Sequence, residues 1–212
     1  MTAYSHIDKL ICEFDRGLRT LTTQFRSTQR SNPAANTADN ELTDQERTLS
    51  GRLMRVNHAG EIAAQGLYHG QALTAHEKNT LQQMEKSARE EEDHLAWCEE
   101  RLQELQTPRS LISPLWYLGS YVIGAGAGLF GDRWSLGFVA ETELQVEQHL
   151  TRHLQRLPAK DKKSRTILEQ MKKDEQRHGQ VARQLGGHQL PKPVTKLMRT
   201  TSKIMTTGAY WL

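Results

Sequence analysis

The sequence has few cysteines and little excess charge, and both shortages restrict what the protein can do. Only Cys12 and Cys98 occur among 212 residues, far apart in the chain. Without a CxxC pair, rubredoxin-like iron sites, zinc ribbons and thioredoxin chemistry are excluded, and a reducing compartment is favoured. The formal net charge is +3, with basic and acidic residues interspersed, so the composition argues against nucleic acid as a partner.

The N-terminus lacks the features of a targeting peptide. It has neither the basic start nor the apolar core of a secretory signal, and Asp8, Glu13 and Asp15 argue against a mitochondrial transit peptide. We therefore expect a bacterial protein or a processed, mature form.

Alternation with the period of a β-strand is also missing, and nearly every segment has helical periodicity. In the clearest case, apolar residues recur every three or four positions from Leu81 to Leu105. The sequence predicts an all-α protein with four parts. These are an N-terminal helix over 1–27, a polar linker over 28–47, a helical bundle over 48–190 whose first helix begins near Thr48, and a C-terminal amphipathic helix over 191–212.

Four helices of the predicted bundle carry a glutamate within an apolar stripe. A buried carboxylate is costly unless it is paired or binds a metal. Two of these glutamates begin Glu-x-x-His motifs, whose side chains share one helix face and can reach a common metal. The six candidate ligands are Glu61, Glu91, His94, Glu143, Glu175 and His178. Two single glutamates and two Glu-x-x-His pairs are the ligand set of ferritin-like di-iron proteins.

The spacing of these residues supports a common site. Glu61 and Glu91 are 30 residues apart, and Glu143 and Glu175 are 32 apart. Residues at equal height in an antiparallel helical hairpin are equidistant from its turn. The midpoints are His76 and Ala159, where the apolar stripes lapse and turn-forming residues appear. Each predicted hairpin thus brings one glutamate level with one Glu-x-x-His pair.

Other assignments are open at this point. The same residues could form buried ion pairs in a bundle without metal. Glu90 and Glu92 flank Glu91 but lack a histidine three residues later, and Glu141 and Glu147 compete with Glu143. Tyr68 and His149 could lie near the metals in a supporting role, or could simply be packed side chains. No role is assigned to the remaining bundle histidines, His58, His69, His76, His153 and His188.

The segment from Leu111 to Phe130 has no formal charge. Twenty residues would extend about 30 Å as a helix, enough to cross a bilayer, but Pro114 and four glycines weaken it. A link between the two hairpins must also run the length of the bundle, as the crossover of ferritin-like folds does. We expect residues 111–131 to form an apolar crossover that inserts at the membrane interface rather than spanning it; burial against the bundle or an identical subunit is the alternative.

The sequence resembles the demethoxyubiquinol hydroxylases of coenzyme Q biosynthesis, which are relatives of ferritin. The resemblance extends from about Arg52 to Leu185, and its first and third motifs are absent from ferritins and rubrerythrins. The motifs are RVNHAGEIAAQGLYHGQ (Arg55–Gln71), EEDHL (Glu91–Leu95), SPLWYLGSYVIGAGAGLFGD (Ser113–Asp132), ETELQVEQHL (Glu141–Leu150) and DEQRHG (Asp174–Gly179). The N-terminal helix and linker precede the matched part of the chain, and one possible role for these two segments is in assembly.

The resemblance implies two iron ions per chain, held by the six residues above with Glu91 and Glu175 bridging. It implies O₂-dependent hydroxylation of the ring of a polyprenylated 3-demethoxyubiquinol by a 3-demethoxyubiquinol 3-hydroxylase. It also implies a peripheral position on the cytoplasmic face of the bacterial inner membrane, an electron donor such as NADH or the quinol pool, and a homo-oligomer or biosynthetic complex. The alternatives are a ferritin-like iron-storage or peroxide-reducing protein and a non-catalytic quinone-binding scaffold.

Overall fold

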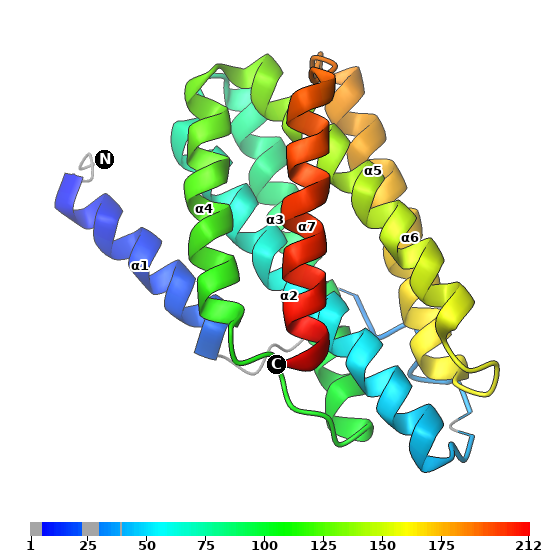
Figure 1. Ribbon diagram of the computed structural model, residues 1–212. Helices are drawn as coiled ribbons and strands as arrows, with labels where there is room; N and C mark the ends of the chain where they lie inside the picture. Colours follow the sequence, from blue (N-terminus) through cyan, green and yellow to red (C-terminus); the bar gives the residue numbers. More distant parts are fainter. Residues whose placement is uncertain (1–5, 23–29, 39) are drawn as a thin grey trace.

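A computed structural model describes residues 6–22, 30–38 and 40–212, and every regular element within these ranges is a helix (Figure 1). This confirms the predicted all-α class. The helices are α1 (His6–Thr22), α2 (Asp44–Thr74), α3 (Lys78–Glu104), α4 (Ser113–Leu129), α5 (Asp132–Arg156), α6 (Lys162–Gln184) and α7 (Lys192–Trp211).

Helices α2, α3, α5 and α6 form the four-helix bundle. Helix α2 pairs with α3, and α5 pairs with α6. The two turns occupy residues 75–77 and 157–161, so His76 and Ala159 both lie between helices as the spacing predicted. Helix α4 links the hairpins and runs along α2, as a crossover must.

The start of α2 differs from the prediction, since the helix begins at Asp44 rather than near Thr48. The cause is a capping box. The Thr43 hydroxyl accepts a hydrogen bond from the Glu46 backbone N–H at 3.3 Å, and the Glu46 carboxylate accepts one from the Thr43 N–H at 2.9 Å. Two otherwise unpaired helix-end donors are thereby satisfied. The last four residues of the predicted linker, 44–47, are therefore helical.

The N-terminal region lies partly outside the described residues. Helix α1 is described as far as Thr22. The predicted helix end at 27 and linker start at 28 fall in residues 23–29, outside the described ranges. Residues 30–38 lie against the bundle, where the Ala34 side chain packs into a core cluster with Leu53 and Trp97. The linker is therefore not simply a solvated spacer.

Two apolar clusters fill the bundle interior on either side of the candidate site. One contains Leu53, Trp97 and Met171; the other contains Tyr68 and Leu136. On each of the four helices, the candidate ligands fall between the residues of one cluster and those of the other. The polar site is thus closed at both ends by apolar layers, which exclude water and hold its side chains in place.

Helix α4 packs on α2 through glycines. A Cβ atom at Gly124 would lie 2.2 Å from the Leu67 carbonyl oxygen, and one at Gly70 would lie 2.1 Å from the Tyr121 oxygen. Only glycine permits such close backbone approach. The glycines that weaken α4 as an isolated helix therefore fix its position in the fold.

The opposite face of α4 is apolar and exposed. Leu115, Leu118 and Val122 are each more than 60% exposed. None of the helices in the described part of the chain is both long enough and apolar enough to cross a membrane. The crossover is thus a helix of 17 residues with one face on α2 and one apolar face uncovered.

Helix α7 lies between α4 and α5 in Figure 1 and covers one side of the bundle. Ala209 is its only buried residue among those described. The Arg55 guanidinium donates hydrogen bonds to the carbonyl oxygens of Ala209 at 2.9 Å and Tyr210 at 2.6 Å. The helix is therefore held mainly at its C-terminal end.

Candidate metal centre

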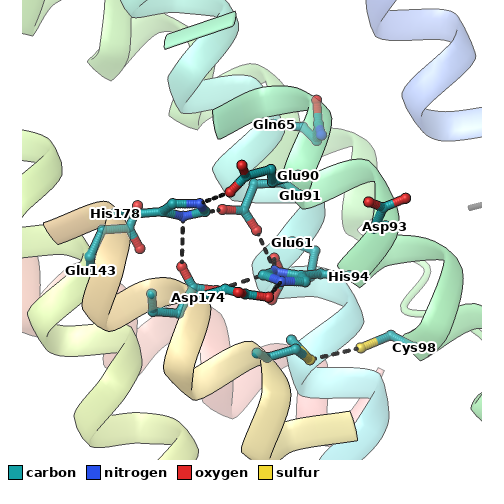
Figure 2. A network of polar contacts seen from close by, with 12 residues as sticks. Glu61, Gln65, Glu90, Glu91, Asp93, His94, Cys98, Glu143, Asp174 and His178 are labelled. Carbon is teal, nitrogen blue, oxygen red and sulfur yellow. Dashed lines mark hydrogen bonds and ion pairs between the residues drawn. The ribbon is translucent and has the colours of Figure 1, made fainter. Parts of the chain in front are cut away.

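The six residues selected from the sequence converge on one site, and all of them except Glu175 are labelled in Figure 2. All are buried, with exposed fractions of 4% or less. They are Glu61 on α2, Glu91 and His94 on α3, Glu143 on α5, and Glu175 and His178 on α6. The competing acids Glu141 and Glu147 are instead hydrogen-bonded to Gln145 and Gln176.

The six side chains form two overlapping groups, each able to hold a cation. One consists of Glu61, Glu91, His94 and Glu175; the other consists of Glu91, Glu143, Glu175 and His178. Within each group the potential ligand atoms lie within 4.8 Å of one another. Glu91 and Glu175 belong to both groups, so these two carboxylates lie between the two positions.

The two histidines are oriented in the same way. Nδ1 of His94 lies 2.8 Å from Glu91 Oε2 and 3.3 Å from Glu175 Oε1. Nδ1 of His178 lies 3.1 Å from Glu91 Oε1 and 3.4 Å from Glu175 Oε2. Both rings therefore present Nδ1 to the shared carboxylates, as ligands to a cation between those groups would.

Each histidine uses its other nitrogen to contact an acid on the opposite helix. His94 Nε2–H donates to Asp174 on α6 at 3.0 Å, and His178 Nε2–H donates to Glu90 on α3 at 2.5 Å. The carboxylates can only accept, so Nε2 carries a proton in both rings, and Nδ1 is the nitrogen that faces the site and can bind a cation that displaces its proton. Carboxylates placed in this way orient metal-bound histidines and increase their basicity.

Asp174 and Glu90 were not selected from the sequence, although the sequence contains a signal for them. Each directly precedes the glutamate of a Glu-x-x-His motif, so both motifs read acid-Glu-x-x-His. Glu90 was considered only as a rival of Glu91. A third missed residue is Arg30, whose guanidinium donates to Asp174 at 2.7 Å and to Asp93 at 3.1 Å.

Burial and mutual repulsion dominate the electrostatics of the site. Burial, and then the charge of Glu91, raise the pKa of Glu61 well above its usual range; burial, and then Glu175, do the same for Glu143. Burial lowers the pKa of His94. The charge of Glu91 and the hydrogen bonds that His94 makes with neighbouring carboxylates outweigh burial and raise this pKa well above its usual value. The site thus concentrates negative charge and stabilises cations placed within it.

The donor set fits metal ions. Glu91 Oε1, Glu175 Oε2 and His178 Nδ1 are buried, and none makes a hydrogen bond within the part of the chain that the structure describes. These three atoms contact one another, with His178 Nδ1 3.1 Å from Glu91 Oε1 and 3.4 Å from Glu175 Oε2, and buried polar atoms that lack a hydrogen bond are costly. Four carboxylates and two imidazoles in an apolar bundle suit iron or manganese better than zinc, which favours fewer ligands in tetrahedral geometry. The arrangement is that of a metal site.

Tyr68 and His149 differ in their relation to this site. The Tyr68 hydroxyl donates a hydrogen bond to Glu143, and its side chain also belongs to the apolar cluster that contains Leu136. His149 makes no hydrogen bond among the described residues, and its ring contacts the His153 ring with centroids 3.8 Å apart and the ring planes tilted by 55°. His58, His69, His76, His153 and His188 lie outside both metal-binding groups.

Two adjoining cavities lead from the site to the surface beneath α7. The inner cavity, about 50 Å³ in volume, is lined by ligand carboxylates together with residues of α2, α5 and α7. The outer cavity, about 570 Å³, lies between α5 and α7. They share the lining residues Val56, Gln145, His149, Ser202 and Thr206. A ligand can therefore approach the carboxylates from the α7 side.

Replacing Asp174 with asparagine is expected to weaken metal binding about 10- to 100-fold, the usual effect of losing a carboxylate that orients a metal-bound histidine. Asparagine can accept the same hydrogen bond but carries no charge for His94 or Arg30. Titration of the metal-free chain with Fe²⁺ under anaerobic conditions measures the change. Asp44→Asn, in the first turn of α2, is the control. Unchanged affinity in Asp174→Asn would show that the contact does not tune His94.

Comparison with known proteins identifies the family of this chain. Residues 48–209 match the family model described as ubiquinone biosynthesis protein COQ7. The chain is 55% identical to the 3-demethoxyubiquinol 3-hydroxylase of Nitrosococcus oceani, covering 98% of this chain and 97% of the relative. It is 53% identical to that of Legionella pneumophila strain Corby, with 100% of both chains covered. The N-terminal helix and linker are therefore shared with these relatives, and the chain belongs to the COQ7 family of ubiquinone biosynthesis proteins.

Proposed function

We propose that this chain is a 3-demethoxyubiquinol 3-hydroxylase with two iron ions bound by Glu61, Glu91, His94, Glu143, Glu175 and His178. The observation that carries the proposal is the pair of overlapping ligand groups, in which Glu91 and Glu175 are common to both. Two positions bridged by carboxylates suit a reaction that needs two metal ions acting together. Family membership and full-length relatives of this activity support the choice of reaction.

The proposed reaction inserts one oxygen atom of O₂ into a ring C–H bond of the quinol. The other oxygen atom leaves as water, which requires two electrons and two protons from a reductant. Iron, when bound, supplies the redox chemistry that activates O₂. Glu91 and Glu175 set the spacing of the two metal positions. Asp174 and Glu90 hold the histidine rings in a fixed orientation. Apolar layers on both sides keep bulk water from the reacting ring.

A single-turnover experiment tests this function. Iron-loaded, chemically reduced protein in detergent is mixed with a demethoxyubiquinol and isotopically labelled O₂, and the quinone is followed by mass spectrometry. Incorporation of one labelled oxygen atom per product is expected. Oxidation of iron without labelled product would contradict the proposal and favour iron storage or peroxide reduction. Normal function after loss of a metal ligand would favour a quinone-binding scaffold.

A lipid-facing surface is the second part of the proposal. Large exposed apolar side chains occur on α1, α4 and α7, and α4 lies between the other two helices in Figure 1. They include Phe14 on α1, Leu118 on α4 and Ile204 on α7, all more than 60% exposed. Exposed apolar patches of this kind mark interaction sites, and a polyprenylated substrate resides in the membrane. We infer that this face rests in the bilayer interface, with the chain peripheral to the cytoplasmic side of the inner membrane.

Placing charge on this face is expected to weaken membrane binding. Leu118 and Val122 lie one turn apart on α4 and are 61% and 63% exposed. Changing both to glutamate should reduce partition onto phosphatidylglycerol-containing vesicles at least about tenfold, because each leucine or valine contributes about 1.5 kcal/mol or more when buried. Vesicle sedimentation measures the effect. The double variant Leu73→Glu with Leu144→Glu is the control, since both residues lie outside α1, α4 and α7; equal loss in both would contradict the assignment.

A further inference from the structure

Besides the ligand carboxylates, six polar side chains line the inner cavity: Asn57, Thr142, Gln145, His149, Ser202 and Thr206. Asn57 on α2 and Thr142 and His149 on α5 lie in its wall beside Glu61 and Glu143. Most of the remaining wall is apolar, including Val146 and Leu150. The cavity is therefore an apolar chamber with metal-binding carboxylates and a separate set of polar groups.

One polar atom of Asn57 and one of Thr142 have no hydrogen-bond partner among the described residues. Asn57 is 3% exposed, and its Oδ1 accepts a hydrogen bond from His153 Nδ1 at 3.1 Å. This contact fixes the amide orientation and leaves Nδ2 as a buried donor with no hydrogen bond among the described residues. The buried Thr142 hydroxyl likewise makes no hydrogen bond among the described residues. A buried polar group without a hydrogen bond is destabilising, which points to a partner that is not part of the chain.

His149 complements these donors as an acceptor. Burial, and then the charges of Arg152 and Arg156, lower the pKa of His149 to about 4, so its imidazole is neutral at physiological pH. A neutral imidazole keeps one nitrogen free to accept a hydrogen bond. His149 lines both cavities, so its ring stands where the inner cavity meets the outer one.

We propose that Asn57, Thr142 and His149 form a subsite that binds the oxygen substituents of the substrate ring and thereby fixes which ring carbon faces the metal centre. The subsite rests on the proposed function. A quinol offers hydroxyl groups that donate and a methoxy oxygen that only accepts, which is the complement of an amide donor, a hydroxyl and an imidazole acceptor. Fixing two or three ring oxygens determines ring orientation, and orientation of the reacting carbon governs the rate.

Helix α7 has to move for the ring to reach this subsite. The inner cavity of about 50 Å³ can hold water but not an aromatic ring. Ser202, Met205 and Thr206 of α7 form its outer wall. Arg55 holds the C-terminal end of α7, so the middle of α7 can separate from α5 without breaking those hydrogen bonds. The hydrogen bond between α5 and α7, from Gln145 Nε2 to the Thr195 carbonyl oxygen at 3.3 Å, lies near the N-terminal end of α7. The ring then occupies space continuous with the outer cavity.

Thr142→Val tests the subsite with two opposite expected changes. The replacement has nearly the same shape and removes only the hydroxyl. Affinity for a demethoxyubiquinone with a short isoprenoid tail should fall about 3- to 10-fold, the effect of one lost hydrogen bond. Quenching of tryptophan fluorescence in iron-loaded, detergent-solubilised protein under anaerobic conditions measures this affinity. The unfolding temperature without quinone should rise by up to a few degrees, because an unpaired buried hydroxyl is gone.

Two further variants make the test specific. Thr142→Ser keeps the hydroxyl and should bind the quinone as the wild type does. Thr207→Val changes a threonine that lines only the outer cavity and should leave affinity unchanged. A merely structural role of Thr142 would lower affinity and unfolding temperature together, and that result would overturn the proposal.

The remaining outcomes separate the subsite from the function. If the wild type binds quinone and incorporates labelled oxygen while Thr142→Val binds equally well, the subsite is wrong and the function stands. Loss of binding in Thr207→Val alone would place the ring in the outer cavity and also overturn the subsite. If the wild type neither binds quinone nor forms product, the proposed function fails and the subsite fails with it.

Discussion

Glu175→Ala is expected to abolish hydroxylation and to prevent both metal positions from filling. Glu175 belongs to both ligand groups, and its carboxylate also lies within 3.4 Å of each histidine. Turnover should fall by more than the factor of about 10 to 100 that is typical when a carboxylate orienting a metal-bound histidine is lost. Iron content per chain and labelled-oxygen incorporation are the two measurements.

Glu143→Ala provides the informative comparison, because Glu143 belongs to one group only. It should leave one position able to bind iron tightly while still abolishing hydroxylation. Glu147→Ala, which removes a contact to Gln176 outside the site, should retain both iron ions and full activity. Full activity in Glu175→Ala would rule out the bridged centre as the site of the reaction.

Gly124→Ala is expected to lower the free energy of unfolding by about 1–3 kcal/mol, the range typical of overpacked interiors. The new Cβ atom would lie 2.2 Å from the Leu67 carbonyl oxygen. Backbone atoms cannot rotate away as a side chain can, so α4 and α2 would have to separate. The midpoint of thermal unfolding should drop by roughly 2–4 °C for each kcal/mol lost.

Gly126→Ala is the matched control on the same helix. Nothing lies within 4 Å of a Cβ atom at Gly126, so alanine there should stabilise α4 by up to about 1 kcal/mol through its higher helix propensity. The two alanine variants are therefore expected to change stability in opposite directions. Equal effects would show that α4 does not pack on α2 through its backbone.

The positions of the candidate ligands could be predicted because two independent patterns coincide in the sequence. Glu91 and Glu175 fall within apolar stripes where a carboxylate requires a partner, and their distances from Glu61 and Glu143 place each pair at one height of a hairpin. The turns at His76 and Ala159 follow from the same arithmetic. The periodicity of the apolar residues and the number of residues between paired ligands determine both features. No tertiary information was therefore needed.

Contacts between helices are less accessible from sequence. The partner of His94 on α6 depends on the relative rotation of two helices, which periodicity does not specify, although the repeated acid-Glu-x-x-His pattern pointed to Asp174 and Glu90. The start of α2 was readable from Thr43 and Glu46, since this spacing is a known capping box. The glycines of α4 were misleading, because helix propensity counts their cost and ignores the close packing on α2 that they allow.

The exchange of acids between α3 and α6 makes the two hairpins interdependent. The acid next to Glu91 steadies the imidazole of the other hairpin, and the acid next to Glu175 returns the same support. A fragment containing only α2 and α3, or only α5 and α6, would keep a Glu-x-x-His pair but lose the group that aims its ring. The centre therefore does not consist of two self-sufficient halves, and a slip of α3 against α6 would misalign both histidines at once.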